Sequence, residues 1–218
     1  MKSLFNRSKT VKAIRPLIVL LLFSSCSSIK YIDSWKNSET PTFQPTKLLV
    51  VGMTNNLTGR AIFEEKLSAA LTEHNINSLK SIDVIDASFT HAEKDETEVN
   101  KMVAKLAKDG YDAIMVTAVK GSDEKELYNP DSYTVRNQWS RFGRYYYRYQ
   151  NVYYTPGYYT KYKVYQIETS IYNINEDDDK SLVWVGSFNL IDPQTITESV
   201  NDYVAAIIKQ LKREKLLQ

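Results

Sequence analysis

The sequence predicts an α/β (α+β) domain in which a mixed β-sheet of about five strands is packed by three helices. The first observation is a pair of largely apolar runs, at 48–51 and at 113–119, which are typical of strands buried on both faces. The second is a change of period, because residues 164–174 alternate as a strand with one solvated face does. The third is a set of segments whose apolar residues recur at helical spacing.

The amino-terminal half of the domain begins with a strand, a helix and a second strand. Residues 47–52 form the first strand, and the polar run at 55–59 predicts a turn after it. A helix is expected over about 60–73, because its apolar residues lie on one stripe. Residues 76–80 then predict a short second strand.

A capped helix leads from there to the third strand. Asp95 and Glu98 have the spacing of a capping box, and Gly110 is expected to end the helix. The third strand, at 113–119, follows directly. Because successive strands joined by helices need crossover connections, we expect these three strands to pair in parallel.

The carboxy-terminal third predicts an antiparallel hairpin followed by a last helix. The two strands are 164–174 and 182–190, and the polar residues 175–179 form the turn between them. Thr195 and Glu198 have the spacing of a second capping box, and an apolar stripe follows it. The complete order is therefore βαβαβ, an insertion, and then ββα.

The segment before the domain has the pattern of a bacterial lipoprotein export signal. Residues 1–25 contain five basic residues and no acid, with an apolar run at 17–23 and small residues before Cys26. A membrane-spanning helix needs about 20 apolar residues, so this run is too short. We interpret 1–25 as a cleaved signal peptide and Cys26 as the first residue of the mature chain. We expect Cys26 to carry lipid, including palmitate. Residues 26–46 are then a lipidated tether, and 47–218 form a single domain.

The alternative for Cys26 is a free cysteine that follows an ordinary signal peptide.

The residue after Cys26 bears on which membrane carries the protein. In enteric lipoproteins an aspartate at that position retains the protein in the inner membrane, so by this resemblance Ser27 favours the outer membrane. Surface-exported lipoproteins of the Bacteroidetes type carry acids just after the cysteine, so by this resemblance the absence of an acid immediately after Cys26 favours the periplasmic face over the cell surface. We therefore expect a lipid-anchored protein of the bacterial cell envelope, on the outer membrane and facing the periplasm.

Composition excludes several kinds of chemistry. Cys26 is the only cysteine, so an intramolecular disulfide and a thiolate metal cluster are excluded. His74 and His91 have no second ligand at metal spacing, and 177–179 lacks the ligand pattern of a calcium loop. We expect no metal and no cofactor. Without residues 1–25 the chain has 23 basic and 26 acidic residues, so it is not expected to bind nucleic acid.

An insertion at 121–161 is the candidate binding segment. Twelve of the 16 tyrosines lie between Tyr128 and Tyr165, together with six basic residues and one acid, Asp131. Tyrosine and arginine are favoured at binding hot spots because each offers a large contact area with a polar end. The alternative is an extended hairpin whose tyrosines shield a sheet edge. The residues expected to contact a partner are Arg141, Arg144, Tyr145, Tyr146, Tyr147, Arg148, Tyr149, Tyr153, Tyr154, Tyr158 and Tyr159.

Three pieces of the sequence carry a resemblance to a known family. They are 57–60 with 63–67, the run 111–117, and 182–186 followed by Asp192-Pro193. On these pieces the chain resembles a largely uncharacterised family of bacterial envelope lipoproteins. It is more distantly similar to the periplasmic module of penicillin-binding-protein activator and curli secretion lipoproteins. The resemblance implies a fold and an envelope location, but one fold hosts many functions.

These observations predict a non-catalytic envelope lipoprotein that binds a protein partner or a cell-wall polymer such as peptidoglycan, partly through the insertion. One alternative is an enzyme acting on envelope glycans or lipids, with a carboxylate site drawn from Glu64, Asp131 and Glu168. Another is a structural subunit of a homo-oligomeric envelope assembly.

Because Arg60 and Glu64 are four residues apart, we expect them to pair on the surface of their helix.

Overall fold

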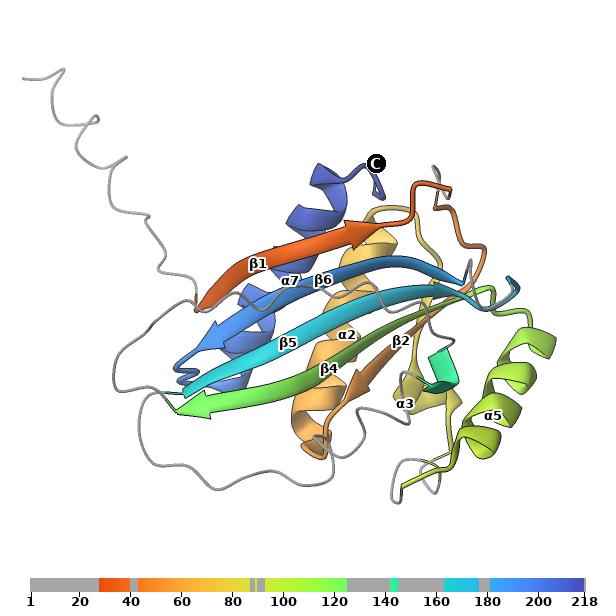
Figure 1. Ribbon diagram of the computed structural model, residues 1–218, viewed down its shortest axis with the longest axis horizontal. Helices are drawn as coiled ribbons and strands as arrows, with labels where there is room; N and C mark the ends of the chain where they lie inside the picture. Colours follow the sequence, from red (N-terminus) through yellow and green to blue (C-terminus); the bar gives the residue numbers. More distant parts are fainter. Residues whose placement is uncertain are drawn as a thin grey trace, which may run out of the picture.

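The computed structural model contains one mixed β-sheet with helices packed against both faces (Figure 1), which confirms the predicted fold class. It describes residues 28–39, 43–86, 89, 93–124, 142–144, 163–176 and 181–217. The strands are β1 (Ile29–Lys36), β2 (Leu48–Met53), β3 (Ser78–Lys80), β4 (Ala113–Glu124), β5 (Lys163–Asn173) and β6 (Leu182–Ile191). Their order in the sheet is β1-β6-β5-β4-β2-β3. As expected, β2 pairs in parallel with β3 and β4, and β5 and β6 form an antiparallel hairpin.

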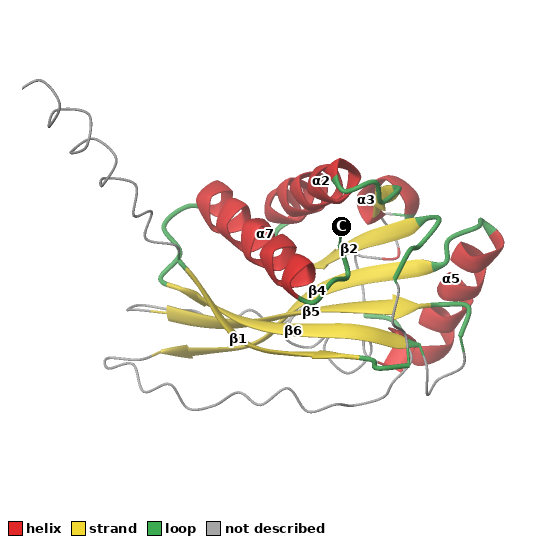
Figure 2. Cartoon of the chain, turned by 90° about the horizontal axis from the view of Figure 1, so that it is seen from above, coloured by secondary structure: helices red, strands yellow, loops and turns green. Residues whose placement is uncertain are grey.

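The helices form a layer on each side of the sheet. They are α2 (Leu57–Glu73), α3 (Ser81–Val84), α5 (Glu96–Lys108) and α7 (Ile196–Arg213). Helices α2 and α7 pack against each other on one face (Figure 2), where Phe63, Leu67 and Ile207 are buried. Helix α5 packs on the opposite face through Val99 and Leu106.

Because both faces are covered, successive residues of the central strands enter two different cores. Leu48 and Val50 of β2 face the core under α2 and α7. Leu49 and Val51 face the core that includes α5. The apolar runs of β2 and of the first part of β4 follow from this arrangement, since both faces of these segments are buried.

Side-chain caps set the starts of the three long helices. The capping box of Asp95 and Glu98 is present at α5, and Thr195 accepts a hydrogen bond from the Glu198 amide at α7. The predicted turn at 55–59 is wrong in part. Asn56 is the N-cap of α2 and accepts from the amide of Gly59, so the helix begins at Leu57 rather than at 60.

The predicted tether at 26–46 contains a strand, so the prediction that the domain begins at residue 47 is also wrong. Strand β1 forms one edge of the described sheet and pairs antiparallel with β6. Ile29 and Tyr31 pack on the core under α7, and Trp35 packs on the opposite core. This strand is the sixth, against the five that were predicted.

A β-bulge explains why β1 has no regular period in the sequence. The register shifts between Tyr31 and Asp33, which leaves Ile32 without a paired residue on β6. Before the bulge the odd-numbered side chains face α7, and after it Ser34 faces α7 while Trp35 faces the other core. Apolar residues that alternate across two faces in this broken pattern resemble an irregular spacer.

Removal of β1 is expected to destabilise the domain strongly. A chain that begins at Asn37 loses the partly buried Ile29, Tyr31 and Trp35 along with the pairing to β6. At roughly 1.5 kcal/mol for each of these side chains, the free energy of unfolding falls by about 4 kcal/mol. Urea unfolding of chains that begin at Ser28 and at Asn37 measures the difference. Equal midpoints would mean that the segment acts as a spacer after all.

Candidate functional site

A buried ion pair holds the end of β2 against α2 and α3. Arg60 and Glu64 lie one turn apart on α2 and are only 3% and 0% exposed. The Arg60 Nε donates to Glu64 Oε1 at 2.9 Å. Ser81, the first residue of α3, bridges the two, because its Oγ accepts from Arg60 Nη2 at 2.7 Å and donates to Glu64 Oε1 at 2.5 Å.

Two backbone amides complete the hydrogen bonding of the Glu64 carboxylate. Gly52 donates to Oε1 and Ile82 donates to Oε2, both at 2.9 Å. A Cβ at Gly52 would lie 3.2 Å from the Phe63 ring, so the missing side chain lets α2 approach the strand. The prediction that Arg60 and Glu64 pair on the helix surface is therefore wrong, since α2 turns both of them towards β2.

A groove of about 440 Å³ opens beside this ion pair, bordered by α2, α7 and the sheet. Its apolar walls come from five elements, with Phe63 on α2, Val119 on β4, Ile167 on β5, Leu190 on β6 and Val200 on α7. It lies at the carboxyl end of β2, through Gly52 and Met53, and over the middle of β4, through Thr117 and Val119. Open α/β sheets bind ligands beyond the carboxyl ends of their parallel strands, and the end of β2 meets that condition. Its volume and its mostly apolar lining are those of a small-molecule site.

Three hydroxyl groups form a chain beside the groove. Tyr203 and Thr117 line it, and both are hydrogen bonded to Thr169, with Oη···Oγ1 at 2.7 Å and Oγ1···Oγ1 at 2.6 Å. Burial raises the pKa of Tyr203 above its ordinary value, so the phenol stays protonated at neutral pH. These hydroxyl groups therefore bond to one another and leave the rest of the wall apolar.

Exposed apolar side chains stand at the starts of the two helices that border the groove. Leu57 begins α2 and is 54% exposed, and Ile196 begins α7 and is 41% exposed. Their N-caps, Asn56 and Thr195, line the groove, as does Ile196 itself. In the described ranges the one other large apolar side chain with this exposure is Ile82 on α3.

The first described residue is fastened to α7 close to the groove. The amide and Oγ of Ser28 donate to Asp202 Oδ2 at 2.8 and 3.1 Å. Asp202 follows the groove residues Ser199 and Val200 by three and two positions. Ser28 is itself two positions after the candidate lipidation residue Cys26, which lies outside the described residues.

A second buried ion pair lies on the opposite face of the sheet. Lys120 Nζ and Glu168 Oε1 are 2.9 Å apart, and the side chains are 5% and 8% exposed. Glu168 pairs across the hairpin with Ser187, and Ser170 lies two residues along β5. The Oγ atoms of Ser170 and Ser187 are buried and have no hydrogen-bond partner among the described residues. Glu168, a candidate carboxylate of the enzyme alternative, is thus engaged with a lysine.

Of the residues expected to contact a partner, Arg144 alone is described. Its Nε lies 3.7 Å from Glu96 Oε1 at the start of α5, and its side chain is 55% exposed. The neighbouring Phe142 is buried against the Tyr172 ring, with ring centres 6.0 Å apart. The insertion therefore touches the core under α5 at this point. Arg141, Tyr145, Tyr146, Tyr147, Arg148, Tyr149, Tyr153, Tyr154, Tyr158 and Tyr159 lie outside the described residues.

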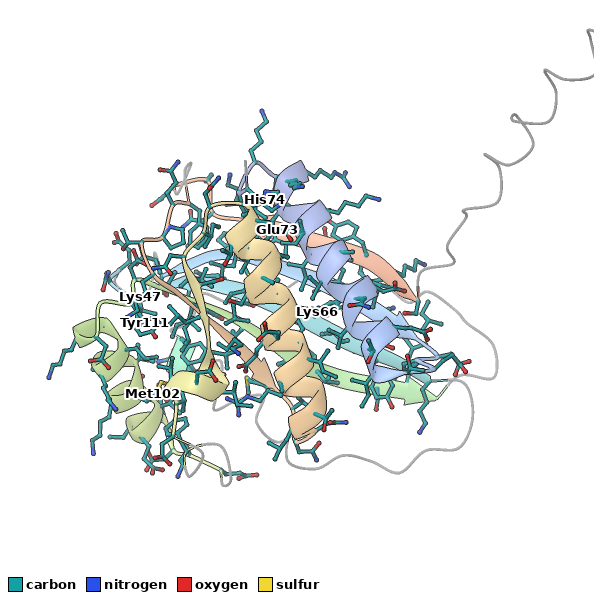
Figure 3. All side chains as sticks on the ribbon, turned by 180° about the vertical axis from the view of Figure 1, so that it is seen from behind. Lys47, Lys66, Glu73, His74, Met102 and Tyr111 are labelled. Carbon is teal, nitrogen blue, oxygen red and sulfur yellow. The ribbon has the colours of Figure 1, made fainter. Side chains whose placement is uncertain are left out.

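The remaining sequence candidates are dispersed. His74 is the C-cap of α2 (Figure 3), while His91 and Asp131 lie outside the described residues. Lys47 and Tyr111, labelled in the same view, form a cation–π contact with the ammonium 4.1 Å from the ring centre. Within the described ranges, His, Cys, Asp and Glu side chains form no group of three suited to a metal ion. Within the same ranges, every helix is too short or too polar to cross a bilayer.

The groove was not predicted from the sequence. Phe63 and Val200 belong to the apolar stripes of the two predicted helices, and a stripe residue that lines a groove looks the same in the sequence as one in the core. The sequence does contain one sign of the groove, at the starts of the two helices. Leu57 and Ile196 are large apolar residues that each directly follow an N-cap residue. A position there that faces water is normally polar, so an apolar residue at both starts indicates a shared surface.

No protein-family model matches this chain, and no curated protein sequence matches it. Among solved structures, the chain is similar to the PelC dodecamer from Paraburkholderia phytofirmans, with 9% identity and a TM-score of 0.42 over 84% of this chain and 95% of that one. It is also similar to the lipoprotein GNA1162 from Neisseria meningitidis, with 13% identity and a TM-score of 0.40 over 78% and 99%. With TM-scores below 0.5, the likeness carries no argument about activity.

Breaking the Arg60–Glu64 pair from one side is expected to be costly. Arg60→Met leaves a buried carboxylate without its counter-charge, which lowers the free energy of unfolding by about 3–5 kcal/mol. The double variant Arg60→Met/Glu64→Met removes both charges and is expected to recover part of the loss. Lys80→Met is the control, since its pairs with Glu65 and Asp83 are exposed. Urea midpoints of the four proteins test this, and a loss in Arg60→Met no larger than in Lys80→Met contradicts it.

The buried phenol of Tyr203 is expected to limit stability in alkali. Its pKa is raised in the folded state, so the unfolded chain loses this proton first. The stabilisation is fully present below the unfolded pKa of about 10 and is lost as pH rises through the folded value. Above about pH 10 the wild type should lose about 1.4 kcal/mol per pH unit relative to Tyr203→Phe. Chemical unfolding of both proteins from pH 8 to 11 measures this, and a constant difference throughout contradicts it.

Proposed function

We propose that this protein is a non-catalytic lipoprotein of the bacterial cell envelope that binds a protein partner or a cell-wall polymer, partly through its Tyr/Arg-rich insertion. A lipid on Cys26 holds it on the outer membrane, facing the periplasm. The observation that supports this best is the position of the folded domain, which starts at Ser28, two residues after Cys26. In place of the expected 20-residue tether, the anchor then fixes the domain directly on the membrane surface.

The insertion leaves and re-enters the sheet at the end where this anchor would lie. Ile29 pairs with Leu190, Leu190 with Tyr165, and Tyr165 with Ser122, so these residues form one row across four strands. Neighbouring strands are about 4.8 Å apart, which places both ends of the insertion within roughly 15 Å of the start of β1. A binding segment rooted there meets whatever lies close to the membrane.

The described carboxylates favour binding over catalysis. Glu64 accepts hydrogen bonds from Arg60, Ser81 and two backbone amides, so its oxygens are occupied by the fold. Glu168 is committed to Lys120 in a buried ion pair. A general acid or base must instead reach a proton on its substrate. Both glutamates thus have a structural role that accounts for their burial.

Crosslinking in cells tests the binding role of the insertion. Glu124 and Lys163 are paired across β4 and β5, so residues 125–162 can be replaced by an Asn-Gly turn without breaking the hairpin. We expect the native protein to form specific crosslinks and the turn variant to lose them. Phe142→Ala is the control, because it removes the packing of the insertion on Tyr172 and keeps the tyrosines. An unchanged set of crosslinked partners would remove the insertion from the function.

A further inference from the structure

The apolar groove and the anchor point occupy the same end of α7. Ser28 is bonded to Asp202, which lies about 4.5 Å along the helix axis from the groove residue Ser199. Two residues of extended chain span about 7 Å, so Cys26 cannot lie farther than that from Ser28. A bilayer that holds a lipid on Cys26 therefore passes close to the mouth of the groove.

The lining of the groove suits an alkyl chain. Phe63, Val119, Ile167, Leu190 and Val200 present apolar atoms from five elements. The hydroxyl groups of Tyr203 and Thr117 already bond to Thr169, so they require no partner from a ligand. The other polar lining residues include the helix caps Asn56 and Thr195, which stand at the starts of the two helices. The site thus has apolar walls, with polar groups at the helix starts.

The exposed residues at the helix starts give the groove a membrane-facing rim. Leu57 and Ile196 are large apolar side chains exposed to water at the two helix ends that border it. In water such exposure has no benefit, but at a bilayer surface these side chains can enter the boundary between headgroups and acyl chains. Their position beside the anchor indicates that this end of the domain meets lipid.

We propose that the groove between α2 and α7 binds one acyl chain of a phospholipid from the membrane on which the protein is anchored. The proposal rests on the proposed function for the location of the protein, but the binding itself uses only described residues. The phospholipid is preferred to a second copy of the chain because a bilayer is the one apolar partner that the anchor brings to this mouth. The bound chain would add a second point of attachment and fix the orientation of the domain.

The test uses the mature chain with Cys26→Ser, so that any lipid contact is independent of the anchor. The protein is mixed with phosphatidylethanolamine–phosphatidylglycerol vesicles that contain a phospholipid with a diazirine on one acyl chain. Illumination and peptide mass spectrometry then identify the labelled residues. We expect labels on α7 and β6 residues that line the groove. Labels spread evenly over the surface, or confined to the face under α5, would overturn the proposal.

Two sets of variants distinguish binding in the groove from non-specific adsorption to the vesicles. Val200→Trp fills the groove and is expected to lose the groove labels, whereas Ala205→Trp, exposed on the same helix, keeps them. Leu57→Gln/Ile196→Gln makes the two exposed helix starts polar, including Ile196 in the groove lining, and is expected to reduce recovery with floated vesicles, while Ile82→Gln does not. If Val200→Trp unfolds, the flotation of the Leu57→Gln/Ile196→Gln variant still tests whether this end of the domain binds lipid, because that variant leaves the buried core unchanged. Equal labelling of the groove residues in Val200→Trp and Ala205→Trp would contradict the proposal.

Two further measurements distinguish the other outcomes. If the groove is covered by a second copy, the Cys26→Ser chain will have the mass of a dimer in solution and Val200→Trp that of a monomer, which overturns lipid binding. Labelling of the native chain with radioactive palmitate in cells, against Cys26→Ser, tests the anchor separately. If the native chain carries no palmitate, or if Cys26→Ser keeps the signal, while the groove labels are intact, the proposed address is contradicted and the lipid site stands. Palmitate that depends on Cys26, without groove labels, contradicts the lipid site alone.

Discussion

The buried Arg60–Glu64 pair is the constraint around which this fold is organised. A charged carboxylate inside a protein is very unfavourable unless its charge and its lone pairs are compensated. Here the compensation comes from β2, α2 and α3 together, through Gly52, Arg60, Ser81 and Ile82. If α2 rotated or moved away from the strand, at least one of these bonds would break. The pair therefore specifies one position for α2, which a purely apolar contact would define less sharply.

The groove depends on that position. With α2 held against the end of β2, its first turn stands opposite the first turn of α7, and the strands close the space behind them. Farther along, the same two helices meet directly and bury Leu67 and Ile207 in one core. Charge compensation at one end and apolar packing at the other thus leave an unfilled apolar volume between the helix starts. On the opposite face, a second ion pair between Lys120 and Glu168 is buried against the same central strands.

Much of the fold was predictable from the sequence, because its strongest signals are local. The apolar runs of β2 and β4, the period of β5 and the caps at Asp95 and Thr195 each depend on neighbouring residues. Three features were not predictable, because they depend on residues far apart in the chain. The bulge at Ile32 breaks the alternation by which β1 could have been predicted. The burial of Arg60 and Glu64 requires Gly52 and Ser81. The groove forms between the starts of two helices that are far apart in the sequence. The insertion remains a prediction, since Arg144 alone among its proposed contact residues is described.

The pairing of β1 also has a consequence for the order in which the domain is completed. Its contacts with α7 join residues 174 to 180 positions apart, through Ser28 with Asp202 and Ser34 with Glu214. If the chain is exported amino end first, β1 crosses the membrane before any partner for it has crossed. Closing so long a loop is entropically costly and slow, so β1 is expected to join the sheet after the hairpin and α7 have formed. The first strand of the sheet to be synthesised is thus the last to join it, and until then the edge of β6 is left unpaired.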